Sequence, residues 1–170
     1  MVKSSRKSKD IAKLVKPSVR ALTAYHVDDT RVRIKLDAME NPFPLPAQVR
    51  DDMARAVRKA MVNRYPDPSA LAVKKAIANI WRMRPDRMIL GNGSDELIQT
   101  IVMAFGGPVL TPTPSFAMYD ITPRALSQDV VTVPLTREFD LDADAVIRKA
   151  RLTGSRVLFL ASPNNPTGNR

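Results

Sequence analysis

Three short polar segments each follow an apolar run, and together they hold the side chains best suited to chemistry. "GNGSDE" begins at Gly91, "TPTPSFAMY" at Thr111 and "SPNNPTG" at Ser162. The first joins a glycine turn to a helix start, where backbone N–H groups attract an anion such as phosphate. The second presents an aromatic ring that can stack, and the third an amide that can donate to an oxygen. Together, the backbone donors, the aromatic ring and the amide favour binding of a flat, phosphorylated ring.

Each segment also has a plainer interpretation. The first equally fits a helix capped by Ser94, with Asp95 and Glu96 placed favourably in the helix dipole. Phe116 taken alone is more typical of ordinary core, and Tyr119 fits either a hydrogen-bond donor or a packing residue. An Asn-Pro bond followed by Thr-Gly is typical of a simple turn. The glycine segment is neither the GxGxxG dinucleotide pattern nor a P-loop, because no Lys-Ser or Lys-Thr pair follows it.

The segments are set among alternating strands and helices. Short apolar runs predict four strands, at 88–90, 108–110, 130–135 and 156–160. Apolar faces with helical spacing predict helices over 94–105 and near 142–150. This alternation indicates an α/β fold with a mostly parallel sheet and flanking helices. In such a sheet, ligands bind in the loops at the carboxyl ends of the strands.

Two further helices are predicted earlier in the chain. Pro46 precedes an apolar stripe that repeats every fourth residue, formed by Val49, Met53, Val57 and Met61. Asp67 and Pro68 predict the cap and first turn of the next helix. Its apolar face is formed by Val73, Ile77, Ile80 and Trp81.

Composition excludes several classes of site. The 170 residues are 44% hydrophobic, enough for one ordinary domain with a core. No apolar run approaches the roughly 18 residues that a membrane span requires. Cysteine is absent and His26 is the only histidine, which excludes disulfides, thiolate chemistry and a multi-histidine metal site. We therefore expect no metal, no membrane partner and a cytoplasmic location.

The net charge of +10 is concentrated at the amino terminus. Residues 1–20 hold seven basic side chains against Asp10 alone, a net +6. Such a segment favours a solvated, disordered tail. A nucleic-acid-binding module and a mitochondrial targeting peptide stay open as alternatives. Nucleic acid is the less favoured partner, because no aromatic residues are interleaved with the basic ones.

In this order, "GNGSDE", "PSFAMY" and "SPNNPTG" resemble the fold-type I pyridoxal-phosphate-dependent aminotransferases. "LTAYH", "KLDAMENP" and "RYPDP" narrow the resemblance to the histidinol-phosphate aminotransferases among them, from about Ala21 to Gly168. The resemblance implies the amino-terminal half of a fold-type I transferase, with an incomplete sheet. Residues 21–45 would form an arm or small-domain segment, and 46–170 the first half of the large, cofactor-binding domain.

The resemblance also implies pyridoxal 5'-phosphate as cofactor and gives roles to residues that bind it. The backbone of Gly93, Ser94 and Asp95 would hold the phosphate. Phe116 would stack on the pyridine ring, and Asn165 would hydrogen-bond its phenolic oxygen. Cis peptide bonds are implied at Thr113–Pro114 and Asn165–Pro166.

Three more residues receive roles by resemblance. Tyr65 would reach the cofactor phosphate of the neighbouring subunit in a homodimer. Tyr25 would line the substrate pocket, and Asn41 belongs to a segment that covers the site.

The implied reaction transfers an amino group between L-histidinol phosphate and 2-oxoglutarate, in histidine biosynthesis. In the family, the cofactor-binding lysine, an aspartate for the pyridine nitrogen and a substrate-binding arginine all follow the "NNPTG" segment. The sequence ends at Arg170, so we assign no catalytic lysine. We expect these residues to be the amino-terminal part of a longer enzyme and to be inactive in transamination by themselves. An aromatic aminotransferase and a threonine-phosphate decarboxylase are the rival activities.

Overall fold

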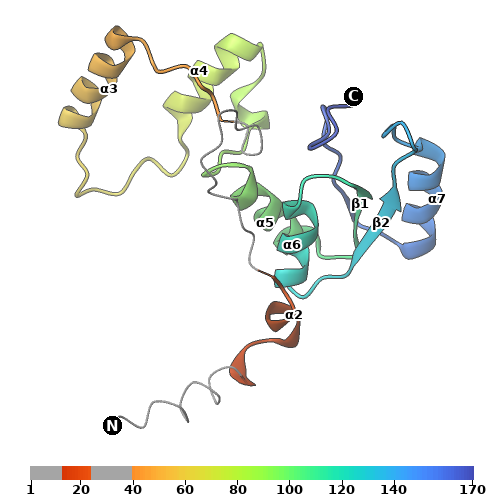
Figure 1. The fold of residues 1–170 in the computed structure, drawn as a ribbon. Helices are drawn as coiled ribbons and strands as arrows, with labels where there is room; N and C mark the ends of the chain where they lie inside the picture. Colours follow the sequence, from red (N-terminus) through yellow and green to blue (C-terminus); the bar gives the residue numbers. More distant parts are fainter. Residues whose placement is uncertain (1–12, 24–39) are drawn as a thin grey trace, which may run out of the picture. The chain divides into compact units, whose positions relative to one another are not determined.

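The computed structural model describes residues 13–23 and 40–170, which fall into two compact units. Residues 13–23 and 90–170 form the first unit, and residues 40–89 belong to the second. Figure 1 traces the elements of both. The expected domain boundary between residues 45 and 46 stays a prediction.

The first unit is built on a parallel sheet with the strand order β2-β1-β3. The strands are β1 (Val109–Thr113), β2 (Val130–Pro134) and β3 (Val157–Leu158). Val109 of β1 lies opposite Val130 on one side and Val157 on the other. The predicted parallel α/β sheet is therefore confirmed for three of the four expected strands.

Helices cover both faces of this sheet (Figure 1). α5 (Ser94–Phe105) and α6 (Met118–Ala125) lie on one face, and α7 (Ala143–Thr153) lies on the other. α5 and α7 were expected, and Asp142 caps α7: the Ala145 N–H donates to Asp142 Oδ1 (2.8 Å). α6 was not expected, because Pro112 and Pro114 come shortly before it and Pro123 lies within it.

Successive residues of β1 belong to two separate hydrophobic clusters. Val109 packs with Ile98 and Val102 of α5, whereas Leu110 packs with Val133 and with Val146 of α7. Both β1 residues are fully buried, since adjacent strand residues point to opposite faces and helices cover each face. The continuous apolar run that predicted this strand thus reflects burial on both sides.

The amino-terminal segment contributes one short helix to the first unit. α2 (Pro17–Arg20) lies against α6, and its Ser18 hydroxyl oxygen is 3.1 Å from that of Ser127, two residues beyond the end of α6. Residues 1–12, which hold most of the basic segment, lie outside the described residues.

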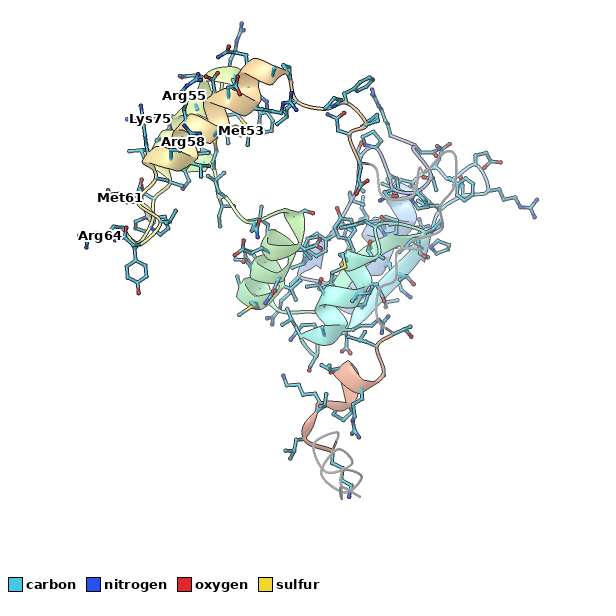
Figure 2. The ribbon with its side chains drawn as sticks, turned by 60° about the vertical axis from the view of Figure 1, so that its left-hand side comes forward. Met53, Arg55, Arg58, Met61, Arg64 and Lys75 are labelled. Carbon is cyan, nitrogen blue, oxygen red and sulfur yellow. The ribbon has the colours of Figure 1, made fainter. Side chains whose placement is uncertain are left out.

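The second unit contains α3 (Ala47–Lys59), α4 (Leu71–Trp81) and a 3₁₀ turn, η1 (Pro85–Arg87). Both α-helices were expected. No residue of α3 is buried, and Val57 in its apolar stripe is 68% exposed. Figure 2 shows Met53 together with Arg55 and Arg58 along this helix. Met61 lies beyond the end of α3, so it does not extend the stripe.

Two local predictions in this part of the chain were wrong. Residues 88–90 do not form a strand, and Ile89 is 67% exposed. A strand needs a neighbour to satisfy its backbone groups, and no described strand pairs with this run. α4 begins at Leu71 instead of Pro68. Asp67 still serves the helix, because its carboxylate accepts from the Ser69 N–H (2.9 Å) and the Leu71 N–H (3.2 Å).

Hydrogen bonds, first of all that from the Ser69 hydroxyl, hold the pKa of Asp67 below its ordinary value. Because the folded pKa is lowered, this contribution to stability is present above the unfolded pKa and is lost as the pH falls through the folded pKa. We expect Ser69→Ala to raise the pKa of Asp67, measured by NMR titration of its carboxyl carbon. The distant change Ser127→Ala should leave it in place. An equal pKa in Ser69→Ala and the unaltered protein contradicts the assignment.

Among the helices of the described segments, none has the length and apolar character that crossing a bilayer requires.

Candidate functional site

The carboxyl edge of the sheet brings the three predicted segments into one neighbourhood. β1 and β3 are adjacent and parallel, so the turns that follow them emerge at the same edge. Only residues 106–108 separate α5 from β1, so α5 runs back along the sheet and begins near that edge. Phe116 packs against the cluster that contains Ile98, one turn into α5. The start of α5 and the two turns therefore share one region of the first unit.

The start of α5 presents open backbone donors. Gly93 has φ 84° and ψ 174°, a conformation that is essentially reserved for glycine. A Cβ on Gly93 would meet no atom within 4 Å, so the turn is open on that side. Ser94 and Asp95 follow in the first turn of the helix, where N–H groups have no carbonyl partner within the helix. This geometry fits an anion.

Local contacts keep this turn in shape. The Gly93 N–H donates to the Gly91 carbonyl oxygen (3.0 Å), and the Asn92 N–H donates to the Glu96 carboxylate. Gly93 is the cap residue and makes no side-chain cap bond. The plainer interpretation, in which Ser94 caps the helix, is therefore wrong, because Ser94 is already helical.

Phe116 has both a packing role and an open side. Its ring is half-buried and meets Tyr119 edge-to-face at 5.4 Å, with 88° between the planes. Phe116 also lines a pocket of about 100 Å³ together with residues of β1, α6 and β2, among them Thr113, Asp120 and Thr132. Tyr119 stacks on Phe159 (4.8 Å, 8°), so it acts as a packing residue here. Phe159 was not singled out, since its apolar run gave no sign of this aromatic contact.

The turn after β3 holds two asparagines, and sequence reasoning chose only one. Asn165 is half-buried in this turn. Its neighbour Asn164 makes the contacts across the edge: Ser115 Oγ–H donates to Asn164 Oδ1 (2.8 Å), and Asn164 Nδ2 donates to the Pro114 carbonyl oxygen (3.0 Å). The adjacent asparagine pair was the available signal. Nothing local shows which member turns toward β1.

The other predicted residues do not belong to the described part of the first unit. Tyr65 and Asn41 belong to the second unit. Tyr65 is 101% exposed, and Asn41 Oδ1 accepts from the Phe43 N–H (3.0 Å). Tyr25 lies outside the described residues. Thr113–Pro114 and Asn165–Pro166 are both cis, as expected, and so are Gly107–Pro108 and Ser162–Pro163.

Residues 31–170 match the family model "Aminotransferase class I and II". The chain belongs to this family. It is 44% identical over 162 residues to histidinol-phosphate aminotransferase 2 of Bordetella parapertussis, covering 93% of this chain and 44% of that protein. It is also 40% identical over 165 residues to a histidinol-phosphate aminotransferase of Thiocapsa roseopersicina, covering 94% of this chain and 87% of that protein. The chain thus spans less than half of the Bordetella relative.

A solved aminotransferase has the same fold. It is histidinol-phosphate aminotransferase from Sinorhizobium meliloti in complex with pyridoxal-5'-phosphate, 25% identical with a TM-score of 0.58. The likeness covers 66% of this chain and 32% of that one. The fold-type I prediction is therefore confirmed, and the described residues of this chain form a portion of the sheet.

Pyridoxal phosphate serves this aminotransferase family, and the carboxyl edge of the sheet offers groups that fit it. The open first turn of α5 suits the phosphate, and the exposed side of Phe116 suits the planar ring. Asn165 carries an amide donor for an oxygen substituent. The Glu96 carboxylate accepts from the Asn92 N–H, which is not one of the donors expected to hold the phosphate.

Proposed function

We propose that the protein containing these residues is a pyridoxal-phosphate-dependent histidinol-phosphate transaminase. It would convert L-histidinol phosphate and 2-oxoglutarate to imidazole acetol phosphate and L-glutamate, within histidine biosynthesis in the cytoplasm. The relatives at 44% and 40% identity, both named for this activity, support the choice of substrate. The observation that carries the proposal is the contact between the turns after β1 and β3 at one edge of the sheet, the edge near which α5 is inferred to begin.

In this proposal, the first turn of α5 holds the cofactor phosphate. The N–H groups of Gly93, Ser94 and Asp95 donate to its oxygens, and the helix dipole adds to their attraction. The Gly93 N–H would exchange its bond to the Gly91 carbonyl (3.0 Å) for one to phosphate. Backbone donors at a helix start bind phosphate without any basic side chain.

Phe116 and Asn165 orient the ring in this proposal. Phe116 provides a flat apolar surface, while its edge-to-face contact with Tyr119 restrains its rotation. The Asn165 amide donates to the phenolic oxygen and favours its ionised form. When bound, pyridoxal phosphate supplies an electron sink for the amino-group transfer. The residues of this chain bind and orient that group.

Substrate and partner contacts complete the proposal. Tyr25 and Asn41 would contact the substrate, and Tyr65 would reach the site of the neighbouring subunit in a homodimer. The full exposure of Tyr65 and the exposed apolar stripe of α3 support a partner for the second unit.

Turnover by the protein expressed from its complete gene tests the proposal. Supplied with pyridoxal phosphate and 2-oxoglutarate, it should produce glutamate faster from L-histidinol phosphate than from L-phenylalanine. A preference for phenylalanine would point to an aromatic aminotransferase. Release of carbon dioxide from threonine phosphate would point to a decarboxylase. Either result rejects the proposed substrate.

Phe116→Leu should weaken pyridoxal phosphate binding by about two- to tenfold, the range that a lost aromatic contact gives. Leucine keeps most of the apolar volume against the α5 cluster, so stability should change little. Binding is measured by absorbance titration, and stability by urea unfolding. A matched control is Phe105→Leu, at the 61% exposed end of α5. If Phe116→Leu alters stability but not affinity, Phe116 is only a core residue.

A further inference from the structure

The pairing of β1 with β3 is too short to fix the turns that follow. The ladder ends at Leu110 and Leu158, with one more bond from the Phe159 N–H to the Leu110 carbonyl oxygen (3.0 Å). Beyond that point β1 continues along β2, whereas the chain after Phe159 leaves the sheet. Strand pairing therefore sets no spacing between the turn with Phe116 and the turn with Asn165.

The side chain of Asn164 joins these two turns directly. Its Oδ1 accepts from the Ser115 hydroxyl (2.8 Å), and its Nδ2 donates to the Pro114 carbonyl oxygen (3.0 Å) and to Thr167 Oγ1 (2.9 Å). A carbonyl oxygen only accepts, so the amide nitrogen must face Pro114, which determines the orientation of the amide. Both Nδ2 protons are thereby used, and the residue is half-buried.

Backbone bonds tie Asn165 to the same anchor. The Asn164 N–H donates to the Asn169 carbonyl oxygen (2.7 Å), and the Gly168 N–H donates to the Asn164 carbonyl oxygen (2.7 Å). These bonds close a turn in which Asn165 directly follows the anchored residue. On the other side, Ser115 directly precedes Phe116. The Asn164 amide thus bridges the immediate neighbours of both proposed ring contacts.

We propose that Asn164 is a positioning residue that sets the spacing between Phe116 and Asn165. Its amide holds the two turns together where the sheet no longer does, so that ring and amide reach the same flat ligand. The inference rests on the function proposed above, and it adds a residue that acts through its neighbours.

The first test needs no cofactor. In the protein expressed from its complete gene, Asn164→Ala removes the bonds between the turns. Amide hydrogen exchange over residues 115–118 should then rise by roughly tenfold. The matched control is Asn169→Ala, on the same turn. Asn169 Nδ2 donates to the Glu138 carbonyl oxygen (3.0 Å) and to Asp140 Oδ1 (2.9 Å), so its loss should leave exchange over 115–118 unchanged.

The second test reads the position of Asn165. The unaltered protein should bind pyridoxal phosphate about tenfold more tightly than the analogue that lacks the phenolic oxygen, because only the former accepts from Asn165. In Asn164→Ala the ratio of the two affinities should fall toward one, while Asn169→Ala should keep the ratio of the unaltered protein. General loosening of the fold would weaken both ligands alike and would leave the preference unchanged.

The two tests separate the inference from the proposed function. Unchanged exchange over 115–118 in Asn164→Ala overturns the positioning role, whatever the ligands do. Equal binding of the two ligands by the unaltered protein overturns the role of Asn165 in cofactor binding, and the exchange result still decides whether Asn164 couples the turns. If Asn164→Ala does not fold, Ser115→Ala removes one of the same bonds from the other turn. In Ser115→Ala, amide hydrogen exchange over 115–118 should rise by a smaller factor than expected for Asn164→Ala. Unchanged exchange in Ser115→Ala would then overturn the inference.

Discussion

Gly93→Ala is expected to weaken binding of pyridoxal phosphate by roughly ten- to hundredfold. Gly93 has φ 84° and ψ 174°, which costs an alanine about 1–3 kcal/mol even though its Cβ would meet no atom. The turn is exposed, so in the free variant it relaxes and moves the Ser94 and Asp95 N–H groups. Binding the phosphate must then restore the strained turn. Isothermal titration measures the loss.

Two comparisons make this result specific to the phosphate. Affinity for pyridoxal, which has no phosphate, should change little in Gly93→Ala. Gly154→Ala places an alanine at φ 63° between α7 and β3, at the edge of the sheet opposite to the site, and should lower stability without changing affinity. A Gly93→Ala variant that binds pyridoxal phosphate as tightly as the unaltered protein contradicts the assignment of the phosphate to α5.

Leu110→Ala should lower the free energy of unfolding by about 2–5 kcal/mol, a large part of the total stability of a small domain. Leu110 is fully buried between the sheet and α7, where it packs with Val133 and Val146. Truncation removes buried apolar surface and leaves a cavity between the sheet and α7. Backbone hydrogen bonds hold both of these layers in shape. Urea unfolding followed by circular dichroism measures the change.

Leu152→Ala is the matched control, because Leu152 lies on α7 and is 81% exposed. Its free energy of unfolding should change by less than about 0.5 kcal/mol. A loss in Leu110→Ala as small as that of the control would show that the cluster of Leu110 does not support the fold.

Most of the first unit could be predicted because its signals are local. The apolar runs of β1 and β2, and the helical spacing of α5 and α7, each lie within a dozen residues. α6 could not be predicted, because the prolines before it and within it disfavour a helix there. The structure stabilises it by burying Thr122 and Pro123. The run 88–90 failed for the opposite reason, since its apolar character finds no described strand to pair with.

The candidate site was only partly predictable. Gly93, Phe116 and Asn165 could be chosen because glycine, an aromatic ring and an amide after strands have recognisable uses. Asn164 and Phe159 could not, because their roles depend on partners elsewhere in the chain. Phe159 stacks on Tyr119, and Asn164 bonds to Ser115, which is 49 residues away in the sequence.

The sequence by itself determined the order of strands, turns and helices, together with the residue types placed after the strands. It did so because periodicity and turn chemistry act between near neighbours. Only the tertiary structure decided that β3 lies beside β1, that two turns meet at one edge and that Asn164 joins them. Those outcomes depend on burying both faces of the sheet and satisfying polar groups across it. No short segment contains that information.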